Sequence, residues 1–214
     1  MASILVVCTG NICRSPMAEG FLRAEILRRD LASSITVASC GTWGWEGSPA
    51  IPESVEAAAE RGADISSHIA RRISPAMVDA AVLVLGLTEE HCAAAVEAVP
   101  AAASRTFTVK ELALLADELP AFEQALEAHT LEGRVAAAHE LRDAGFEGNP
   151  LDMDVVDPLG LAFETYKAVA WEIDELCGRI ADGLLGRAPA GAPAGAPARA
   201  PASAPAAAVT GEDD

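Results

Sequence analysis

The sequence predicts an α/β domain built on an open, mostly parallel sheet of four strands, with helices on both faces. Short aliphatic and β-branched runs alternate with longer stretches that carry apolar residues at helical spacing. A helix separates successive strands, which favours parallel pairing. At 214 residues the chain can form one well-packed core. We expect a domain over residues 1–186, followed by a disordered tail over residues 187–214 that is rich in Ala, Pro and Gly.

Local signals predict where the elements begin and end. Ser15 is expected to cap the first helix, with Pro16 at its first position. Thr88 and Thr108 are expected to cap later helices, and Gly62 to end one. In chain order the expected strands are 3–7, 34–39, 80–85 and 105–107; the expected helices are 17–29, 52–61, one from Thr88 to Pro100, two within 112–141 separated at Pro120, and 161–185.

The turn after the first strand carries the residues with the clearest chemistry, in the string Cys8-Thr9-Gly10-Asn11-Ile12-Cys13-Arg14-Ser15. Backbone N–H groups from Thr9 to Arg14 can curl toward one point in front of the helix, which favours an anion. Arg14 adds a planar fork that matches two phosphate oxygens. A thiol at Cys8 in such surroundings is expected to be largely thiolate and nucleophilic. The turn therefore predicts a nucleophile beneath a phosphate-binding loop.

Composition excludes several classes of function. The net charge is -17, from 32 acidic and 15 basic residues, so a basic surface for nucleic acid or anionic membrane is not expected. The best apolar run, residues 80–87, is far shorter than the roughly twenty residues of a membrane span, and no secretory leader is predicted. Five scattered cysteines indicate a reducing cytoplasm and no disulfide framework. No metal site is expected, because His91, His129 and His139 lack ligand spacing and are interpreted as helix-surface residues.

A cysteine followed after five residues by Arg-Ser is the signature of cysteine-dependent phosphatases, and the string Val7 to Pro16 resembles the low-molecular-weight protein tyrosine phosphatase family. The resemblance extends over roughly residues 1–186. It includes three further stretches: Ser39-Cys40-Gly41-Thr42, His68-Ile69-Ala70-Arg71 and Asp157-Pro158. It implies a hydrolase for phosphotyrosine in protein substrates, active without a cofactor. The sequence does not assign an oligomeric state, and a monomer is the expectation.

The resemblance also implies roles for individual residues. Cys8 would attack phosphorus to give a phosphocysteine intermediate, and Arg14 would bind the equatorial oxygens. Asp157 would protonate the leaving group and later deprotonate water. Ser15 would stabilise the thiolate. Asn11, in a left-handed conformation, would join Ser15, Ser39 and His68 in a hydrogen-bonded network that holds the loop. Asp152 and Asp154, near Asp157, are interpreted as solvated loop charges.

Substrate preference is predicted from positions around the loop. Trp45, and with it Trp43, would form walls for a phenyl ring. Ile12 favours phosphotyrosine, since relatives that act on phosphoarginine resemble this chain in the loop but carry threonine there. Where eukaryotic members have tyrosines after Asp-Pro, this chain has Leu159-Gly160, which leaves that wall unassigned.

Two alternative functions belong to other classes of protein. A thiol-coupled arsenate reductase would need a second, closely spaced cysteine pair, and Cys92 and Cys177 do not form one. A non-catalytic reader of phosphate groups would need neither the thiol nor the acid. For Cys13, two interpretations stay open: a partner that traps oxidised Cys8 as a disulfide, or a small buried residue facing the first helix.

Overall fold

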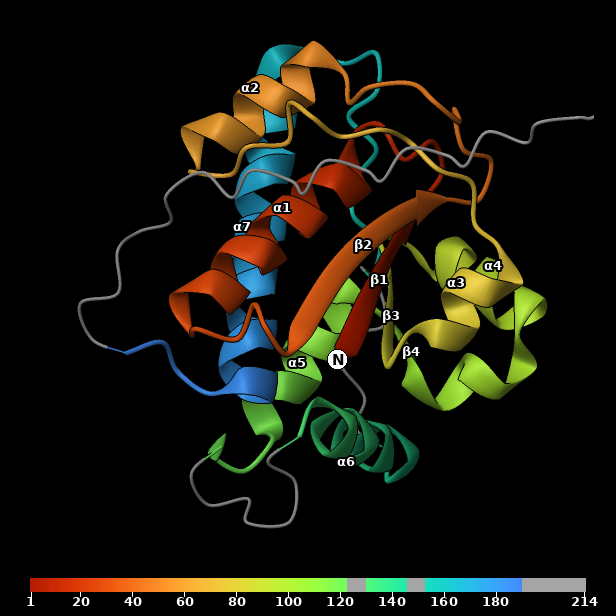
Figure 1. Cartoon of the computed structure of the whole chain (residues 1–214), viewed down its shortest axis with the longest axis vertical. Coiled ribbons are helices and arrows are strands. Elements are labelled where there is room, and N and C mark those ends of the chain that lie inside the picture. Colours follow the sequence, from red (N-terminus) through yellow and green to blue (C-terminus); the bar gives the residue numbers. More distant parts are fainter. Residues whose placement is uncertain (123–129, 146–152, 190–214) are drawn as a thin grey trace, which may run out of the picture.

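The computed structural model describes residues 1–122, 130–145 and 153–189. Its centre is a sheet of four parallel strands in the order β2-β1-β3-β4, so the first strand lies inside the sheet (Figure 1). The predicted fold class is confirmed. The strands are β1 (Ala2–Cys8), β2 (Ile35–Gly41), β3 (Leu83–Gly86) and β4 (Thr106–Thr108).

Helices cover both faces of the sheet, and each face has its own apolar cluster. The larger cluster joins α1, α2, α5, α6 and α7 to the sheet, while the smaller one joins α3, α4 and the 3-10 helix η1 to the other face. The helices are α1 (Arg14–Arg28), α2 (Pro52–Glu60), α3 (Pro75–Ala80), α4 (Glu89–Ala98), η1 (Pro100–Arg105), α5 (Val109–Glu118), α6 (Leu131–Asp143) and α7 (Phe163–Leu185).

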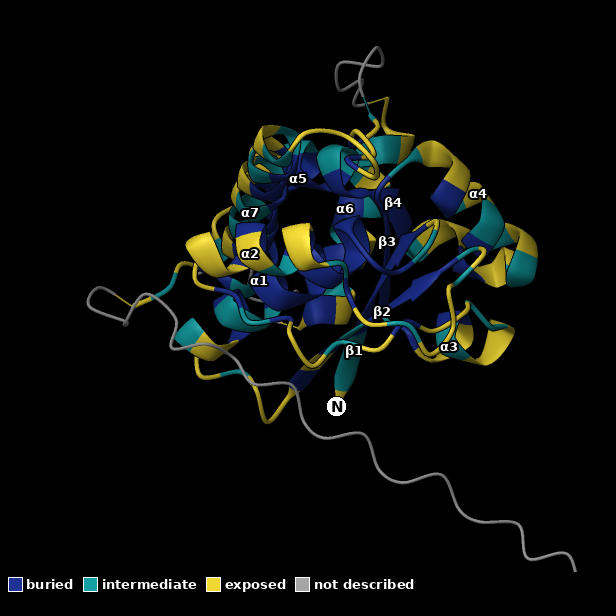
Figure 2. Ribbon diagram, turned by 90° about the horizontal axis from the view of Figure 1, so that it is seen from above, coloured by how far each residue is buried: buried dark blue, intermediate teal, exposed yellow. Residues whose placement is uncertain are grey.

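The alternation of side chains along β1 decides which face receives the reactive cysteine. Leu5 and Val7 point into the smaller cluster, whereas Ile4, Val6 and Cys8 belong to the larger one. Both sets are buried, as expected for a central parallel strand, and the strands appear dark blue between their covering helices in Figure 2. Cys8 is therefore the last residue of β1 and lies on the side covered by α1 and α7.

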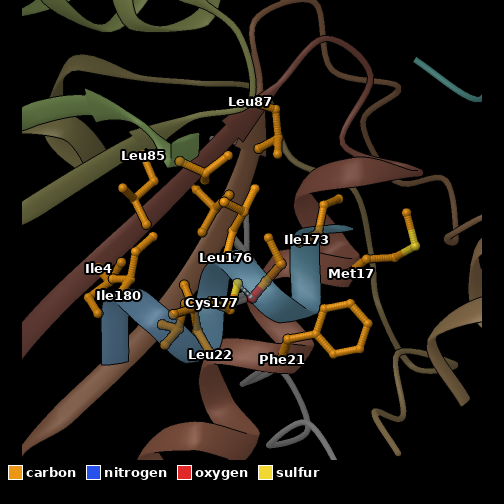
Figure 3. Packing of buried hydrophobic residues seen from close by; sticks show 14 of the residues in the cluster. Ile4, Met17, Phe21, Leu22, Leu85, Leu87, Ile173, Leu176, Cys177 and Ile180 are labelled. Atoms are coloured by element: carbon orange, nitrogen blue, oxygen red, sulfur yellow. Dashed lines mark hydrogen bonds between the residues drawn. The ribbon is translucent and has the colours of Figure 1, made fainter. Parts of the chain in front are cut away.

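The larger core is formed where α7 lies along α1 beneath the sheet. Figure 3 shows Ile173, Cys177 and Ile180 of α7 gathered against Phe21 and Leu22 of α1, with the strand residues above them. Close packing of these buried side chains fixes the position of α1 relative to β1. The loop between those two elements is thereby held at both of its ends.

Two boundary predictions are wrong. Helix α1 begins at Arg14 with Cys13 as its N-cap and no side-chain cap, so Ser15 lies inside the first turn. Residues 80–82 are not strand: α3 ends at Ala80 and β3 begins at Leu83. The sequence did contain a signal for α3, since Ser74 precedes Pro75 and its hydroxyl accepts a hydrogen bond from the N–H of Met77.

The other boundaries agree with the structure within a few residues. Thr88 and Thr108 cap α4 and α5 through their hydroxyls, and Gly62 follows α2 with φ of 84°. Pro120 falls between α5 and α6, as predicted. Residues 190–214 lie outside the described residues, so the disordered tail stays a prediction.

The packing of α7 leads to a stability prediction. Ile173 is fully buried, so Ile173→Ala leaves a cavity and should lower the free energy of unfolding by about 2–5 kcal/mol. Trp171 on the same helix is 56% exposed, and Trp171→Ala should change it by about 0.5 kcal/mol or less. Urea unfolding of both variants measures the difference; equal losses would contradict the placement of α7.

Candidate active site

The loop between β1 and α1 turns its carbonyl groups outward. The carbonyl oxygens of Cys8, Thr9, Gly10 and Ile12 accept hydrogen bonds at 2.8–3.2 Å from backbone N–H groups within residues 42–51. The N–H groups of residues 10 and 12–14 have no hydrogen-bond acceptor within the described chain. A loop held by its carbonyls in this way presents its N–H groups to a common centre, which is the arrangement that binds a phosphate group.

Glycine at position 41 permits this close contact between β2 and the loop. A Cβ atom at Gly41 would lie 2.5 Å from the Thr9 carbonyl oxygen and 3.0 Å from the Asn11 nitrogen. Any side chain there would push the loop away from Cys8. This explains physically why the stretch Ser39 to Thr42 contains a glycine.

Cys8 lies at the base of the loop and is 2% exposed. Its Sγ atom is 2.9 Å from the Ser15 hydroxyl oxygen, and it accepts a hydrogen bond of 3.2 Å from the backbone N–H of Asn11. The loop and the first turn of α1 thus each place one polar group against the sulfur. Here Ser15 is found at the sulfur, in place of the helix cap that the sequence predicted.

Asn11 has φ of 55°, the left-handed conformation that was predicted for it. Its side-chain amide donates to the hydroxyls of Ser15 at 2.9 Å and Ser39 at 2.8 Å. His68 Nε2 donates to the Asn11 carbonyl at 2.8 Å. The predicted supporting residues therefore meet at one point.

Two members of this network were missed from the sequence. Glu19 is 3% exposed and accepts a hydrogen bond of 2.5 Å from the Ser39 hydroxyl, and the backbone N–H of Arg71 donates to Asn11 Oδ1 at 2.8 Å. Glu19 lies one helical turn after Ser15, a spacing that puts both side chains on one face of α1. That spacing was the available signal.

Arg14 and Asp157 come together across the opening of the loop. Arg14 Nη2 lies 2.7 Å from Asp157 Oδ2, and Nη1 donates to the Val155 carbonyl at 3.0 Å. The Arg14 side chain is 5% exposed and that of Asp157 is 46% exposed. The N–H of Leu159 holds the other carboxylate oxygen at 3.1 Å. A residue 143 positions away is thus brought to the loop.

A pocket of about 70 Å³ opens above Cys8. Loop residues 8–10 and 12–14 form its floor, and Trp45, Asp157 and Leu159 form its walls. This volume suits a small anion with one flat group leading out of it. Of the predicted wall residues, Ile12 and Trp45 line the pocket. Trp43 is 74% exposed and does not line it, while Leu159 fills the wall that the sequence left unassigned.

Cys13 is buried near Cys8, and burial raises the pKa of its thiol to about 12. The Cys13 thiol is therefore protonated at neutral pH, which makes it a poor nucleophile. A disulfide between Cys8 and Cys13 stays a prediction; all five cysteines are free in the structure.

The interpretation of His91 as a surface residue is wrong. Its side chain is buried in the first turn of α4, with Nε2 3.0 Å from Thr9 Oγ1 and Nδ1 2.8 Å from Thr88 Oγ1. Burial, followed by the positive charge of Arg14, lowers the pKa of His91 to about 4. His91 is therefore neutral at physiological pH.

Other polar side chains were predicted with mixed success. Asp154 is exposed but is not merely a solvated charge, since it accepts a hydrogen bond of 2.8 Å from the N–H of Glu89 and so helps to cap α4. His139 lies on α6 beside Arg142, with its side chain 31% exposed. His129 and Asp152 lie outside the described residues.

The described residues contain neither a cluster of metal ligands nor a membrane-spanning helix. Among residues 1–122, 130–145 and 153–189, no group of three or more His, Cys, Asp and Glu side chains is placed to hold a metal ion. Within the same part of the chain, no helix combines the length and the apolar character that crossing a lipid bilayer requires.

The geometry defines a class of protein before any comparison. A thiol under inward-facing N–H groups, with an arginine at the seventh position of the loop and a carboxylic acid across its opening, is the arrangement expected of a cysteine-dependent phosphatase.

Comparisons with known proteins agree. The model of the family "Low molecular weight phosphotyrosine protein phosphatase" matches residues 3–118. A probable low molecular weight protein-tyrosine-phosphatase, EpsP, of Ralstonia nicotianae is 37% identical over 131 residues, which cover 58% of this chain and 86% of the relative. A protein-arginine-phosphatase of Geobacillus stearothermophilus is 29% identical over 181 residues, 85% of this chain and 95% of the relative.

Solved structures give the same result. A low molecular weight protein tyrosine phosphatase from T. tengcongensis has a TM-score of 0.63 at 32% identity, covering 86% of this chain and 100% of that one. A YwlE mutant from Bacillus subtilis has a TM-score of 0.64 at 26% identity, covering 86% and 99%. The chain belongs to the low molecular weight protein tyrosine phosphatase family.

The buried histidines lead to a prediction about pH. An unfolded histidine binds its proton below about pH 6.5, whereas His91 in the folded protein does so only below about pH 4. Within that window the unfolded state binds more protons, so the free energy of unfolding falls as the pH falls, by roughly 3 kcal/mol from this residue. Burial also lowers the pKa of His68, which acts in the same direction.

Urea unfolding between pH 7.5 and 4 measures this dependence. His91→Gln removes the titrating group, so the variant should have a flatter profile between pH 6.5 and 4 than the wild type. The carboxylates titrate in both proteins, and the comparison therefore isolates His91. Parallel profiles would contradict the buried, neutral histidine.

Proposed function

We propose that this enzyme hydrolyses phosphotyrosine in proteins through a phosphocysteine intermediate, with Cys8 as nucleophile, Arg14 as phosphate-binding residue and Asp157 as general acid and base. The observation that carries the proposal is the convergence of these three side chains on one small pocket above the N–H groups of the loop. The roles of Thr9, Gly10, Asn11, Ile12, Cys13 and Ser15 as phosphate-binding loop residues are part of the same proposal.

In the first step the Cys8 thiolate attacks phosphorus from the floor of the pocket. The loop N–H groups and Arg14 bind the three equatorial oxygens, whose charge they stabilise in the transition state. The bond between phosphorus and the phenolic oxygen breaks as the sulfur–phosphorus bond forms. Asp157 gives its proton to the departing phenolate, so tyrosine leaves as the neutral phenol.

In the second step water attacks phosphorus along the path that the phenol has left. Asp157, now a carboxylate, takes a proton from that water, and the sulfur–phosphorus bond breaks. The hydroxyl of Ser15, 2.9 Å from Sγ, stabilises the thiolate as it leaves. The products are tyrosine and inorganic phosphate, and the enzyme returns to its starting protonation state.

The pocket walls support phosphotyrosine as substrate. Ile12, Trp45 and Leu159 give the opening an apolar lining that fits the faces of a phenyl ring. Among residues 1–122, 130–145 and 153–189, Asp157 is the one carboxylate that lines this pocket, and the proposed mechanism uses it for proton transfer. Within that part of the chain, a guanidinium group would have no further acidic partner in the pocket. Phosphoarginine is nevertheless the competing substrate, because a relative that covers 85% of this chain is a protein-arginine-phosphatase.

We further infer that the enzyme acts as a monomer in the reducing cytoplasm. Cys8 must stay reduced to attack phosphorus, and none of the five cysteines is engaged in a disulfide. The protein's strong negative charge does not favour nucleic acid as a partner. The phosphatase domain is proposed to end near residue 186, with residues 187–214 dispensable for turnover.

Two substitutions test the mechanism. Cys8→Ser should abolish turnover, because a hydroxyl at this position is a far weaker nucleophile. Asp157→Ala should lower kcat/KM for a phosphotyrosine peptide by about 10²–10⁴-fold, and much less for an aryl phosphate whose leaving group needs no proton. Asp154→Asn, which alters a nearby carboxylate outside the pocket, is the control and should keep nearly full activity. Equal losses on both substrates would exclude Asp157 as the acid.

A panel of peptides tests the substrate. Wild-type enzyme should have a higher kcat/KM for phosphotyrosine than for phosphoarginine or phosphoserine peptides of the same sequence. Ile12→Thr should reduce that preference, because it replaces part of the apolar wall with a hydroxyl. A wild-type preference for phosphoarginine would overturn the substrate proposal and leave the phosphocysteine mechanism intact.

A further inference from the structure

His91 is a buried polar side chain that the mechanism above does not use. It reaches from α4 into the edge of the phosphate-binding loop, where it contacts the Thr9 hydroxyl at 3.0 Å. The same hydroxyl accepts a hydrogen bond of 3.3 Å from Arg14 Nη2. We propose that His91 is a positioning residue, which holds the Thr9 hydroxyl and through it sets the plane of the Arg14 guanidinium.

A neutral imidazole can link the two threonine hydroxyls. Arg14 can only donate, so Thr9 Oγ1 is its acceptor. A neutral ring has one nitrogen that donates and one that accepts, so His91 can bond to Thr9 Oγ1 at 3.0 Å and to Thr88 Oγ1 at 2.8 Å in either tautomer. Burial, followed by the Arg14 charge, keeps the ring neutral by lowering its pKa.

The contact matters because Arg14 changes partner during the reaction. In the structure Arg14 Nη2 donates to both Asp157 and Thr9, while Nη1 donates to the Val155 carbonyl. A phosphate oxygen can take the place of Asp157, but Thr9 and Val155 stay. These two acceptors are then what keeps the guanidinium in the plane that suits the equatorial oxygens.

Both acceptors are anchored to the same short segment after β3. The N–H of Val155 donates to the Leu87 carbonyl at 2.8 Å, and Thr9 is held by His91, whose partner is Thr88. Thr88 caps α4, and its hydroxyl accepts the N–H of His91 at 3.4 Å. Residues 87–91 therefore support Arg14 from two sides.

His91 could instead have a purely structural role, in which it supports the cap of α4 through Thr88. Two variants distinguish this structural role from the positioning of Arg14. His91→Asn keeps a polar group near the position of Nδ1, which reaches Thr88 but not Thr9. His91→Gln keeps one near the position of Nε2, which reaches Thr9. If His91 positions Arg14, His91→Gln should retain at least half of kcat on a small aryl phosphate. His91→Asn and His91→Ala should lose about tenfold, with KM changed less than about threefold.

Thr9 supplies the second half of the test. Thr9→Val removes the hydroxyl at nearly constant volume and should reproduce the loss of His91→Ala, whereas Thr9→Ser, which retains the hydroxyl, should lose less kcat than Thr9→Val. The double variant Thr9→Val with His91→Ala should be no slower than Thr9→Val alone, because both changes break one chain of hydrogen bonds. His139→Gln on α6 is the control and should match the wild type.

The outcomes are decisive in both directions. Equal activity of His91→Asn and His91→Gln, or losses that multiply in the double variant, would overturn the inference. If urea titration shows that the His91→Ala variant is not folded, the comparison of His91→Asn with His91→Gln and that of Thr9→Val with Thr9→Ser still test the inference. The inference rests on the proposed function: a wild-type protein without Cys8-dependent turnover would refute that function, whereas an active wild type with unaffected His91 variants would refute only this role.

Discussion

The left-handed backbone at Asn11 is the constraint on which the rest of the site depends. A non-glycine residue in this conformation costs about 1–2 kcal/mol, and Asn11 is fully buried there. Four hydrogen bonds hold it in place. Its side-chain amide donates to the hydroxyls of Ser15 and Ser39. Its backbone carbonyl accepts from His68, and its side-chain oxygen accepts from the Arg71 N–H. Because the backbone reverses at this residue, its N–H turns back to Cys8 Sγ. Residues of α1, β2 and the segment around residue 70 thus all form hydrogen bonds that hold the backbone at Asn11.

The second support of the site comes from the later half of the domain. Arg14 extends from the start of α1 to acceptors that belong to the loop before α7, and the segment after β3 secures them in turn. These residues are neighbours only because β3 lies directly beside β1 in the sheet. The strand order β2-β1-β3-β4 therefore does more than form a core: it brings Leu87 and Thr88 beside the loop that Cys8 begins.

The fold could be predicted because helix caps and turns depend on neighbouring residues in the sequence. The site was harder to predict because it depends on the direction in which helix side chains point. Helix caps such as Thr88, and the strand-to-helix turn, depend on residues that are adjacent in the sequence, so they can be predicted from it. Glu19 and His91 were missed because their roles depend on which face of a helix meets the loop, and this follows from packing of α1 and α4 on opposite faces of the sheet. Ser15 was misread for a related reason. A serine before a helix is usually a cap, but here Cys8 Sγ lies within 2.9 Å and takes its hydroxyl.

In the proposed mechanism, the ion pair between Arg14 and Asp157 links substrate binding to acid catalysis. The Asp157 side chain is 46% exposed, so this ion pair contributes only about 1 kcal/mol or less to the free energy of folding. Phosphate offers Arg14 charge-assisted hydrogen bonds of about 1.5–3 kcal/mol each, together with the N–H groups of the loop. We therefore expect substrate to displace Asp157 from the guanidinium. The released carboxyl would then lie beside the leaving oxygen, and binding of the substrate would free Asp157 for its proposed role as the acid of the first step.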